Sequence, residues 1–324
     1  LLQYSKKSSP RIDFSTMPLP LFDEPFLRKL ERLALLSRRA TAGQMQGERR
    51  SPKRGQSVEF ADFRPYVAGD DFRRIDWNAY ARLERFFIKL FVEEEDLTVH
   101  FLIDASRSMD WPENASEHNK LQYAVRAAGA LGYVALTGLD RVTVHILNAG
   151  NGMRSTAHLP AIRGKKQAIT LFSFLQALSS GEHGYGQKTS GRGIAHQLGA
   201  YAVNAPLVGP LILCSDLMDD GWMEGINSLA GRGFEVTVLH LLSPDETNPS
   251  LNGDFKLVDS ENDSSVEITA DYEMLQRYHQ SLLDWRETWR RFCGARGIHY
   301  TSIETSVPLE ELLFAWMRQQ GVLR

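Results

Sequence analysis

Three oxygen-bearing side chains alternate with other residues at the end of one apolar run. The segment TVHFLIDASRSM, residues 98–109, carries Asp104, Ser106 and Ser108. Its apolar part predicts a buried strand, so the three polar side chains are expected in the loop that follows. Carboxylate and hydroxyl oxygens suit a small hard cation such as Mg²⁺ or Mn²⁺, and Mg²⁺ usually keeps waters that another ligand can replace. The alternative is a simple turn or helix cap, which needs only one such residue.

A second apolar run also ends in a carboxylate. Residues 211–214 predict a short buried strand, and Asp216 follows it closely. If the two strands are neighbours, Asp216 lies near Asp104 and becomes the second carboxylate of the metal site. The alternative is that Asp216 caps the next helix, although Asp219 and Asp220 are better placed for capping.

A third donor is expected from a glycine-rich stretch. Residues 184–193, GYGQKTSGRG, carry Thr189 and Ser190 just before a predicted helix. Either hydroxyl is a candidate ligand, and Thr189 is preferred. Glycine and hydroxyl residues are also common where helices begin, so this loop has a purely structural interpretation as well.

The elements around these residues alternate between long helices and short apolar strands. Helices are expected near residues 117–137, 164–179, 191–203, 222–231, 271–296 and 308–319. Strands are expected near 141–147, 153–159, 211–215, 234–241 and 298–303, with a hairpin of 254–258 and 265–269 in an insertion near 243–270. This alternation predicts an α/β fold with a doubly wound, mostly parallel sheet. Ligands of such sheets bind outside the carboxyl ends of the strands, at the topological switch point.

The part of the chain before residue 97 has a different character. Residues 23–42 have apolar residues at helical spacing, and the basic segment 28–54 holds nine Lys or Arg against two Glu. The amphipathic helix either packs on its own domain or docks on a membrane surface or partner. Residues 57–67 and 86–92 read as strands. The expected organisation is an N-terminal tail, helix and loop at 1–55, a β-rich region at 56–96 and the α/β domain at 97–324.

Composition limits the class of protein. The chain has 324 residues, a formal charge of −3 and two cysteines, Cys214 and Cys293, without a CxxC pair. A disulfide framework or zinc site is therefore not expected, and a cytoplasmic, reducing location fits best. No apolar run approaches the roughly 20 residues that span a bilayer, and no secretory signal is evident. Met17 is the expected natural start, because residues 1–16 are polar and without pattern.

The sequence contains few residues arranged for catalysis. GxSxG, HExxH and a complete P-loop are all missing. A cation held by neutral hydroxyls and only two carboxylates stays attractive to an acidic side chain from a partner protein. We therefore expect a non-enzymatic, metal-dependent protein-binding module. The first alternative is a metal-dependent phosphohydrolase using Asp104, although Ser106 stands where such phosphatases carry a second Asp. The second is binding of anionic membrane or nucleic acid through the basic segment 28–54.

Two segments resemble known families. The pattern Asp104, Ser106 and Ser108, with a later Thr189 and a strand-terminal Asp216, resembles the metal-ion-dependent adhesion site of von Willebrand factor A domains over about residues 97–304. That resemblance implies a divalent cation above a parallel sheet, completed by a partner carboxylate. Residues 59–96, EFADFRPYVAGDDFRRIDWNAYARLERFFIKLFVEEED, closely resemble the bacterial family named domain of unknown function 58. This second resemblance implies association with a MoxR-type AAA+ ATPase and an adaptor or chaperone-like role.

Overall fold

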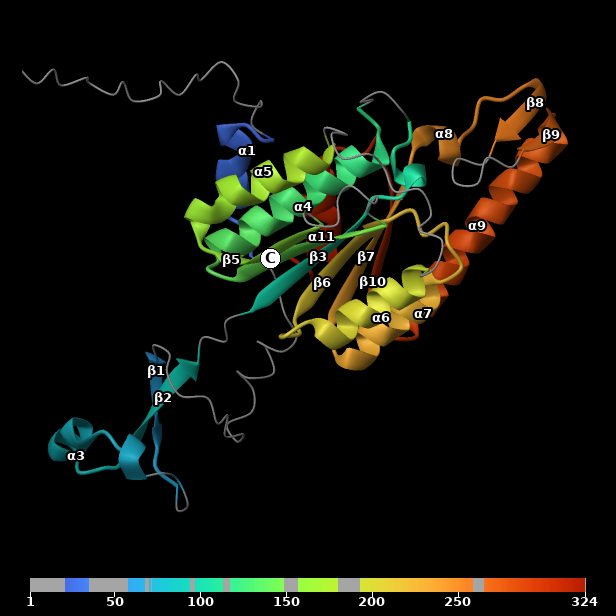
Figure 1. Cartoon of the computed structure of the whole chain (residues 1–324). Helices are drawn as coiled ribbons and strands as arrows, with labels where there is room; N and C mark the ends of the chain where they lie inside the picture. Colours follow the sequence, from blue (N-terminus) through green and yellow to red (C-terminus); the bar gives the residue numbers. More distant parts are fainter. Residues whose placement is uncertain are drawn as a thin grey trace, which may run out of the picture.

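A six-stranded sheet forms the centre of the computed structural model, which describes residues 21–34, 58–67, 70, 72–93, 97–112, 117–148, 157–179, 193–258 and 265–323. The strand order is β10-β7-β6-β3-β4-β5 (Figure 1). The strands are β3 (Thr98–Asp104), β4 (Arg141–Leu147), β5 (His158–Arg163), β6 (Pro210–Ser215), β7 (Glu235–Leu242) and β10 (His299–Glu304). Only β4 and β5 pair antiparallel within this sheet. The predicted α/β class with a mostly parallel sheet is confirmed.

The direction of strand addition reverses at β3. From β3 the chain adds β4 and β5 on one side, and it then adds β6, β7 and β10 on the other. In open α/β sheets the ligand crevice lies outside the carboxyl ends of the strands at this reversal. Asp104 ends β3 and Ser215 ends β6, and the two strands pair in parallel. The two polar segments singled out by sequence therefore meet at the same edge of the sheet.

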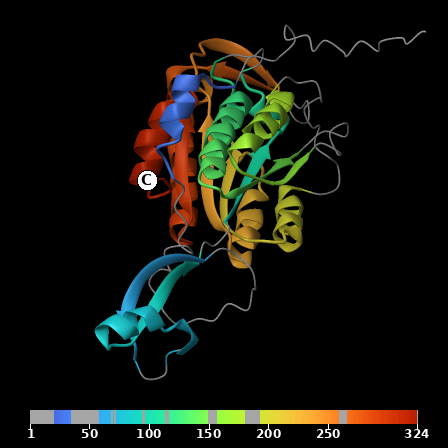
Figure 2. The same cartoon turned by 90° about the vertical axis from the view of Figure 1, so that its left-hand side faces the viewer.

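Helices cover both faces of the sheet (Figures 1 and 2). One face packs against α1 (Glu24–Leu30), α4 (Lys120–Thr137) and α5 (Ala168–Ser179). The C-terminal segment of the chain packs on the same face and consists of α10 (Leu309–Glu311), a π-helical turn (Leu312–Trp316) and α11 (Met317–Gln319). The other face packs against α6 (Ile194–Asn204), α7 (Trp222–Arg232) and the end of α9 (Tyr272–Gly294). Phe101 and Ile103 join the first core and Leu102 joins the second, as the two-residue period of a strand requires.

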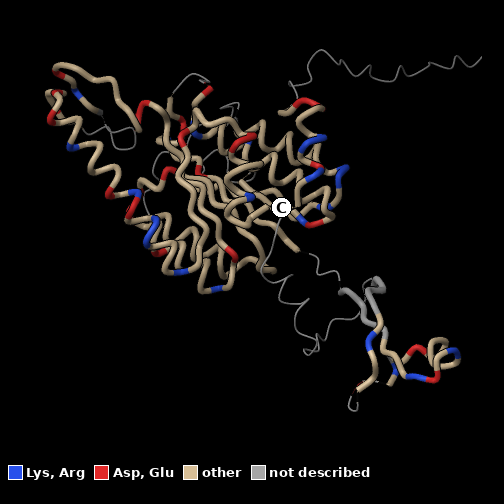
Figure 3. Tube along the Cα trace, turned by 180° about the vertical axis from the view of Figure 1, so that it is seen from behind, with Lys and Arg blue, Asp and Glu red and all other residues tan. Residues whose placement is uncertain are grey.

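Burial on both faces explains the apolar sequences of the four central strands, β3, β4, β6 and β7. In all six strands, Lys, Arg, Asp and Glu occur only at the first or last position, while charged residues lie along the outer helices (Figure 3). Each Leu, Ile or Phe buried in this way contributes about 1.5–3 kcal/mol relative to exposure. The ends of the strands are therefore held in place by a large apolar core on each side.

An insertion separates β7 from β10. It contains α8 (Pro244–Thr247), a hairpin of β8 (Gly253–Val258) and β9 (Ser265–Ala270), and the N-terminal part of α9. Only the C-terminal part of α9 enters the core, through Trp289 and Cys293. Figure 1 shows the rest of α9 running past the sheet to the β8–β9 hairpin. The predicted hairpin and long helix are confirmed.

Residues 58–93 form a separate small unit, called here the hairpin unit. It pairs β1 (Val58–Pro65) with β2 (Phe87–Glu93) and carries a 3₁₀ turn (Phe72–Arg74) and α3 (Trp77–Leu83). The Arg64 guanidinium contacts both Asp70 carboxylate oxygens, at 2.6 and 2.7 Å. The rings of Tyr80 and Phe86 stack with centroids 4.4 Å apart. The two predicted strands of this region are confirmed.

Two elements differ from expectation. The helix expected over 23–42 ends at Leu30, because the next backbone bonds run from i to i−3 and turn Leu33 into the core. Its apolar face packs on α4, and residues 35–57 lie outside the described residues. The edge strand is placed at His158–Arg163, further along than the expected 153–159, because pairing with β4 sets its register. Among the helices that the structure describes, none has the length and apolarity to cross a bilayer.

Candidate metal centre at the switch point

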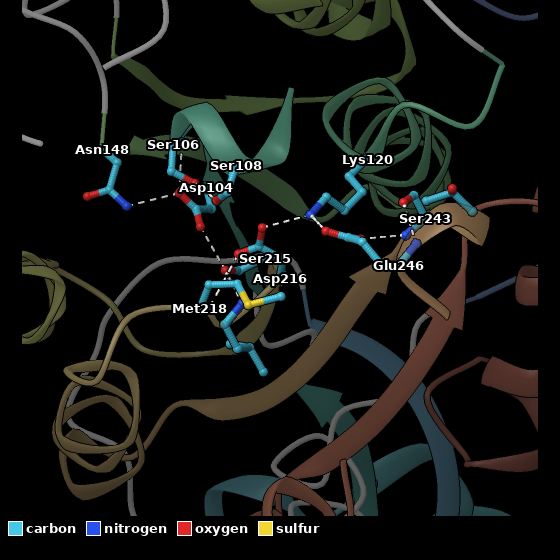
Figure 4. A network of polar contacts seen from close by, with 12 residues as sticks. Asp104, Ser106, Ser108, Lys120, Asn148, Ser215, Asp216, Met218, Ser243 and Glu246 are labelled. Atoms are coloured by element: carbon cyan, nitrogen blue, oxygen red, sulfur yellow. Dashed lines mark hydrogen bonds and ion pairs between the residues drawn. The ribbon is translucent and has the colours of Figure 1, made fainter. Parts of the chain in front are cut away.

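Asp104 is the central side chain of the site (Figure 4). It ends β3, is 2% exposed, and accepts three hydrogen bonds in the described structure. Two of them reach Oδ1, from the Ser106 backbone N–H at 3.0 Å and from Asn148 Nδ2 at 2.9 Å. The third reaches Oδ2 from Ser215 Oγ at 2.7 Å. All three donors are neutral, so they orient the carboxylate without compensating its charge.

The hydroxyls of Ser106 and Ser108 form the second part of the site. Their Oγ atoms lie 3.0 Å apart after β3 and share a hydrogen bond, in which either hydroxyl can donate. Ser106 begins a 3₁₀ turn (Arg107–Met109), and the fully buried Met109 anchors that turn in the core. Adjacent ligands of octahedral Mg²⁺, bound at 2.0–2.1 Å, lie about 3.0 Å from one another. The hydroxyl spacing therefore fits two neighbouring positions of such a cation.

Asp216 supplies the second carboxylate, and a lysine holds it. Asp216 is 1% exposed and accepts a charged hydrogen bond at Oδ2 from Lys120 Nζ, at 2.9 Å. Its Oδ1 accepts the Met218 backbone N–H at 3.3 Å. Lys120 is 0% exposed and also pairs with Glu246 Oε1 at 2.6 Å. Asp216 is thus oriented by the protein's own cation, whereas Asp104 is not.

Burial and charge shift the pKa values of these groups. Burial, and then the nearby Asp216 carboxylate, raise the pKa of Asp104 to about 6. Burial alone would lower the pKa of Lys120, but the Asp216 and Glu246 carboxylates more than offset this and raise it. Two buried carboxylates near each other repel, and one ammonium serves both Asp216 and Glu246. The site would gain from a further positive charge beside Asp104.

Several side chains of the site were missed by sequence reasoning. Asn148 follows β4, has a positive φ of 52°, and exchanges two hydrogen bonds with Gln197 of α6, at 3.0 and 2.9 Å. Leu217, next to Asp216, has a φ of 58°. Backbone in this region is uncommon outside glycine and tends to occur at functional sites. Asn148 could have been found by the rule that selected Asp104, because it too directly follows a parallel strand.

Lys120 could have been found from the pattern of its helix. It is a basic residue in the first turn of α4, where the helix dipole disfavours a cation. It also lies on the buried side of a helix whose other buried residues are almost all apolar. A charge in such a position indicates a buried acidic partner.

The structure brings together four of the five predicted metal ligands. Asp104, Ser106, Ser108 and Asp216 meet at the switch point, while Thr189, like Ser190, lies outside the described residues. Within the described parts of the chain, no three His, Cys, Asp or Glu side chains gather as a metal site. Any cation here would therefore depend on hydroxyl oxygens as well as carboxylates, and Mg²⁺ accepts such a set more readily than zinc does.

The chain is similar to several mycobacterial proteins. It is 25% identical over 286 residues to the uncharacterized protein Rv1480 of Mycobacterium tuberculosis (strain H37Rv), covering 87% of this chain and 86% of that one. The uncharacterized protein Mb1516 of Mycobacterium bovis matches to the same extent. Each of these similarities spans most of both chains.

Two solved structures resemble this chain with low TM-scores. The conserved hypothetical protein BatB from Bacteroides thetaiotaomicron has 15% identity and a TM-score of 0.36 over 64% of this chain and 90% of that chain. An aerotolerance-related membrane protein from Bacteroides fragilis has 16% identity and a TM-score of 0.38, covering 65% of this chain and 92% of that one. These scores are too low to establish a common fold.

A protein-family model matches most of the chain. The model described as "Protein of unknown function DUF58" matches residues 62–288, well over half of the chain. The match runs from the hairpin unit through the switch point and into α9. The chain belongs to the DUF58 family.

Proposed function

We propose that this chain is a non-enzymatic, metal-dependent protein-binding module whose sheet is a doubly wound one of von Willebrand factor A type. Asp104, Ser106, Ser108 and Asp216 would hold Mg²⁺ or Mn²⁺, and Thr189 or Ser190 would add a hydroxyl. The observation that carries the proposal is the pairing at the switch point of two serine hydroxyls 3.0 Å apart with a buried carboxylate that only neutral groups contact. That combination leaves negative charge and free oxygen lone pairs at one point.

The arrangement favours binding over hydrolysis. Both oxygens of Asp104 accept hydrogen bonds, which hold the carboxylate in one orientation and lower its strength as a nucleophile. Ser106 occupies the position where an aspartyl phosphatase would need a second carboxylate. A cation in this site would keep affinity for an acidic side chain supplied by a partner, because neutral hydroxyls leave its charge incompletely balanced.

The partner is proposed from the family. Members of DUF58 are expected to work with a MoxR-type AAA+ ATPase, so an acidic residue of such an ATPase is the proposed ligand of the cation. The free, buried Cys214 and Cys293 support a reducing, cytoplasmic location. Contact with a membrane surface, or with nucleic acid, through the basic segment 28–54 stays a separate alternative, which a steep loss of binding with salt would reveal.

Calorimetric titration of the full chain with MgCl₂ and MnCl₂ tests the metal site. We expect saturable binding to the wild type and none to a Ser106→Ala/Ser108→Ala variant, which keeps every carboxylate. Asp284→Asn, an exposed change on α9, is the control and should bind as the wild type does. Absence of binding to the wild type at millimolar metal would refute the metal site.

Capture of a purified MoxR-type ATPase tests the function. Binding should require Mg²⁺, be lost in EDTA and be lost in Asp104→Ala, while Asp284→Asn retains it. Capture that ignores metal and Asp104 would contradict the proposal. Phosphatase turnover that Asp104→Asn abolishes would favour the hydrolase in its place.

A further inference from the structure

Lys120 is a buried ammonium shared between two acidic groups that come from distant parts of the chain. Its Nζ lies 2.9 Å from Asp216 Oδ2 and 2.6 Å from Glu246 Oε1 (Figure 4). Neither Lys120 nor Asp216 has appreciable contact with solvent, and Glu246 is largely buried. Attraction and repulsion among these charges are therefore screened far less than on the surface.

Lys120 and Glu246 are each held in place by the N-terminal cap of their helix. Asn119 caps α4, because its side chain accepts the Gln122 N–H at 3.0 Å, and this sets where Lys120 begins the helix. Glu246 belongs to a capping box in α8, in which its Oε2 accepts the Ser243 backbone N–H at 2.7 Å. The positions of Lys120 and Glu246 are therefore determined by the backbone of α4 and α8.

Glu246 also stands at the base of the insertion. It belongs to α8, which follows β7 and precedes the β8–β9 hairpin. Tyr278 of α9 donates a hydrogen bond from its hydroxyl to the Glu246 backbone carbonyl at 2.6 Å. Lys120 therefore connects the insertion and α9 to Asp216 through a short chain of polar contacts.

The positive charge of Lys120 repels a cation at the switch point, and the negative charge of Glu246 weakens this repulsion. An ammonium that neutralises Asp216 leaves less negative charge for a metal ion. A carboxylate that shares the ammonium restores part of that negative charge. The two side chains should hence change metal affinity in opposite directions.

We infer that Lys120 is a positioning residue that acts as the internal counter-cation of Asp216, and that Glu246, at the base of the insertion, sets how strongly Lys120 competes with the bound metal. This inference rests on the proposed metal site. It adds a role for the insertion, because a change in the position of α8 would alter the affinity of the site for its cation.

Glu246→Gln is the sharpest test. Glutamine has one acceptor oxygen, so it can keep the capping box with Ser243 only by giving up the hydrogen bond from Lys120, and it removes the negative charge beside Lys120. We expect the Mg²⁺ dissociation constant, measured by calorimetry at pH 8, to rise about threefold to tenfold. Asp245→Asn, on the exposed side of the same short helix, removes an equal charge away from Lys120 and should change the constant less than about twofold. Equal effects of the two variants would overturn the inference.

Lys120→Met should act in the opposite direction. Without the ammonium, the negative charge of Asp216 is no longer neutralised from within the protein, so Mg²⁺ should bind about tenfold more tightly. The variant should also unfold at a lower temperature in EDTA, because it leaves a buried carboxylate unpaired, and saturating Mg²⁺ should raise that temperature by more than it does in the wild type. If Lys120→Met cannot be purified folded, Glu246→Gln and Asp245→Asn still decide the question.

The outcomes separate this inference from the proposed function. Mg²⁺ binding that is unchanged in Glu246→Gln and Lys120→Met leaves the metal site standing but overturns the role of Lys120. Failure of the wild type and of both variants to bind Mg²⁺ overturns the proposed site and, with it, this inference. Opposite shifts in the two variants, with a small shift in Asp245→Asn, support both.

Discussion

The carboxyl end of the central sheet and the hairpin unit differ in the side chains that they bury and expose. At the sheet, ionisable and polar groups are buried and paired, as in Asp104 and Lys120. In the hairpin unit, large aromatic side chains are exposed, and Trp77 is 60% exposed while its ring packs edge-on against Tyr80 and Phe86. A site can be held rigid in the first region, whereas the second presents an apolar surface.

The difference follows from the amount of core available to each region. The sheet is covered by helices on both faces, so the ends of its strands are fixed by many buried residues. The hairpin unit has two strands and one short helix, which cannot enclose all of its aromatic side chains. Its shape depends on local contacts such as the Arg64–Asp70 pair and the stack of Tyr80 on Phe86.

A matched pair of tryptophan substitutions should give the largest contrast. Trp222 begins α7 and is 1% exposed within the second core, whereas Trp77 begins α3 and is 60% exposed. We expect Trp222→Ala to lower the free energy of unfolding by about 3–5 kcal/mol and Trp77→Ala by less than about 1 kcal/mol. Urea denaturation measures both. A loss of several kcal/mol in Trp77→Ala would show that the aromatic surface of the hairpin unit is covered in solution.

Acid should weaken the sheet and spare the hairpin unit. Burial lowers the pKa of His240 to about 3 and that of His100 to about 4, from an ordinary value near 6.5. Because the folded pKa is depressed, the neutral form stabilises the fold above pH 6.5, and this stability is lost as the pH falls toward the folded pKa. At pH 5 the free energy of unfolding should be lower than at pH 7 by about 2 kcal/mol for each of these histidines.

Amide hydrogen exchange at pH 7 and pH 5 distinguishes the two regions. Residues 58–93 contain no histidine, so protection of the hairpin unit should change little while protection of β3 and β7 falls. His240→Gln should reduce the acid sensitivity of β7. Equal loss of protection in both regions would contradict the contrast.

The smallest effect is expected at the ion pair of the hairpin unit. Arg64 is partly exposed and binds Asp70 through two nitrogens, which lowers the pKa of the Asp70 carboxyl. Arg64→Lys keeps the charge but loses the two-pronged contact, so we expect only a slight loss of stability and a rise in the Asp70 pKa seen by NMR titration. Arg82→Lys on α3 is the control. An unchanged Asp70 pKa in Arg64→Lys would show that the pair contributes nothing in solution.

Local sequence determined the elements and which of them end in candidate ligands. Apolar runs with a two-residue period marked the strands, and Asp104, Ser106 and Ser108 had to follow one of them. The rule that ligands lie at the carboxyl ends of parallel strands then added Asp216. Element ends were less well determined, as the short α1 and the displaced β5 show, because caps and strand pairing depend on neighbours.

Only the tertiary structure decided how the charges are paired. Lys120 meets Asp216 and Glu246 across 96 and 126 residues of sequence, and Asn148 reaches Asp104 across 44. No periodicity encodes such contacts, because they arise when helices pack across strands that are distant in sequence. The sequence therefore determined that a carboxylate and two hydroxyls stand at the end of β3, and the packing of α4 and α8 determined which charges surround them.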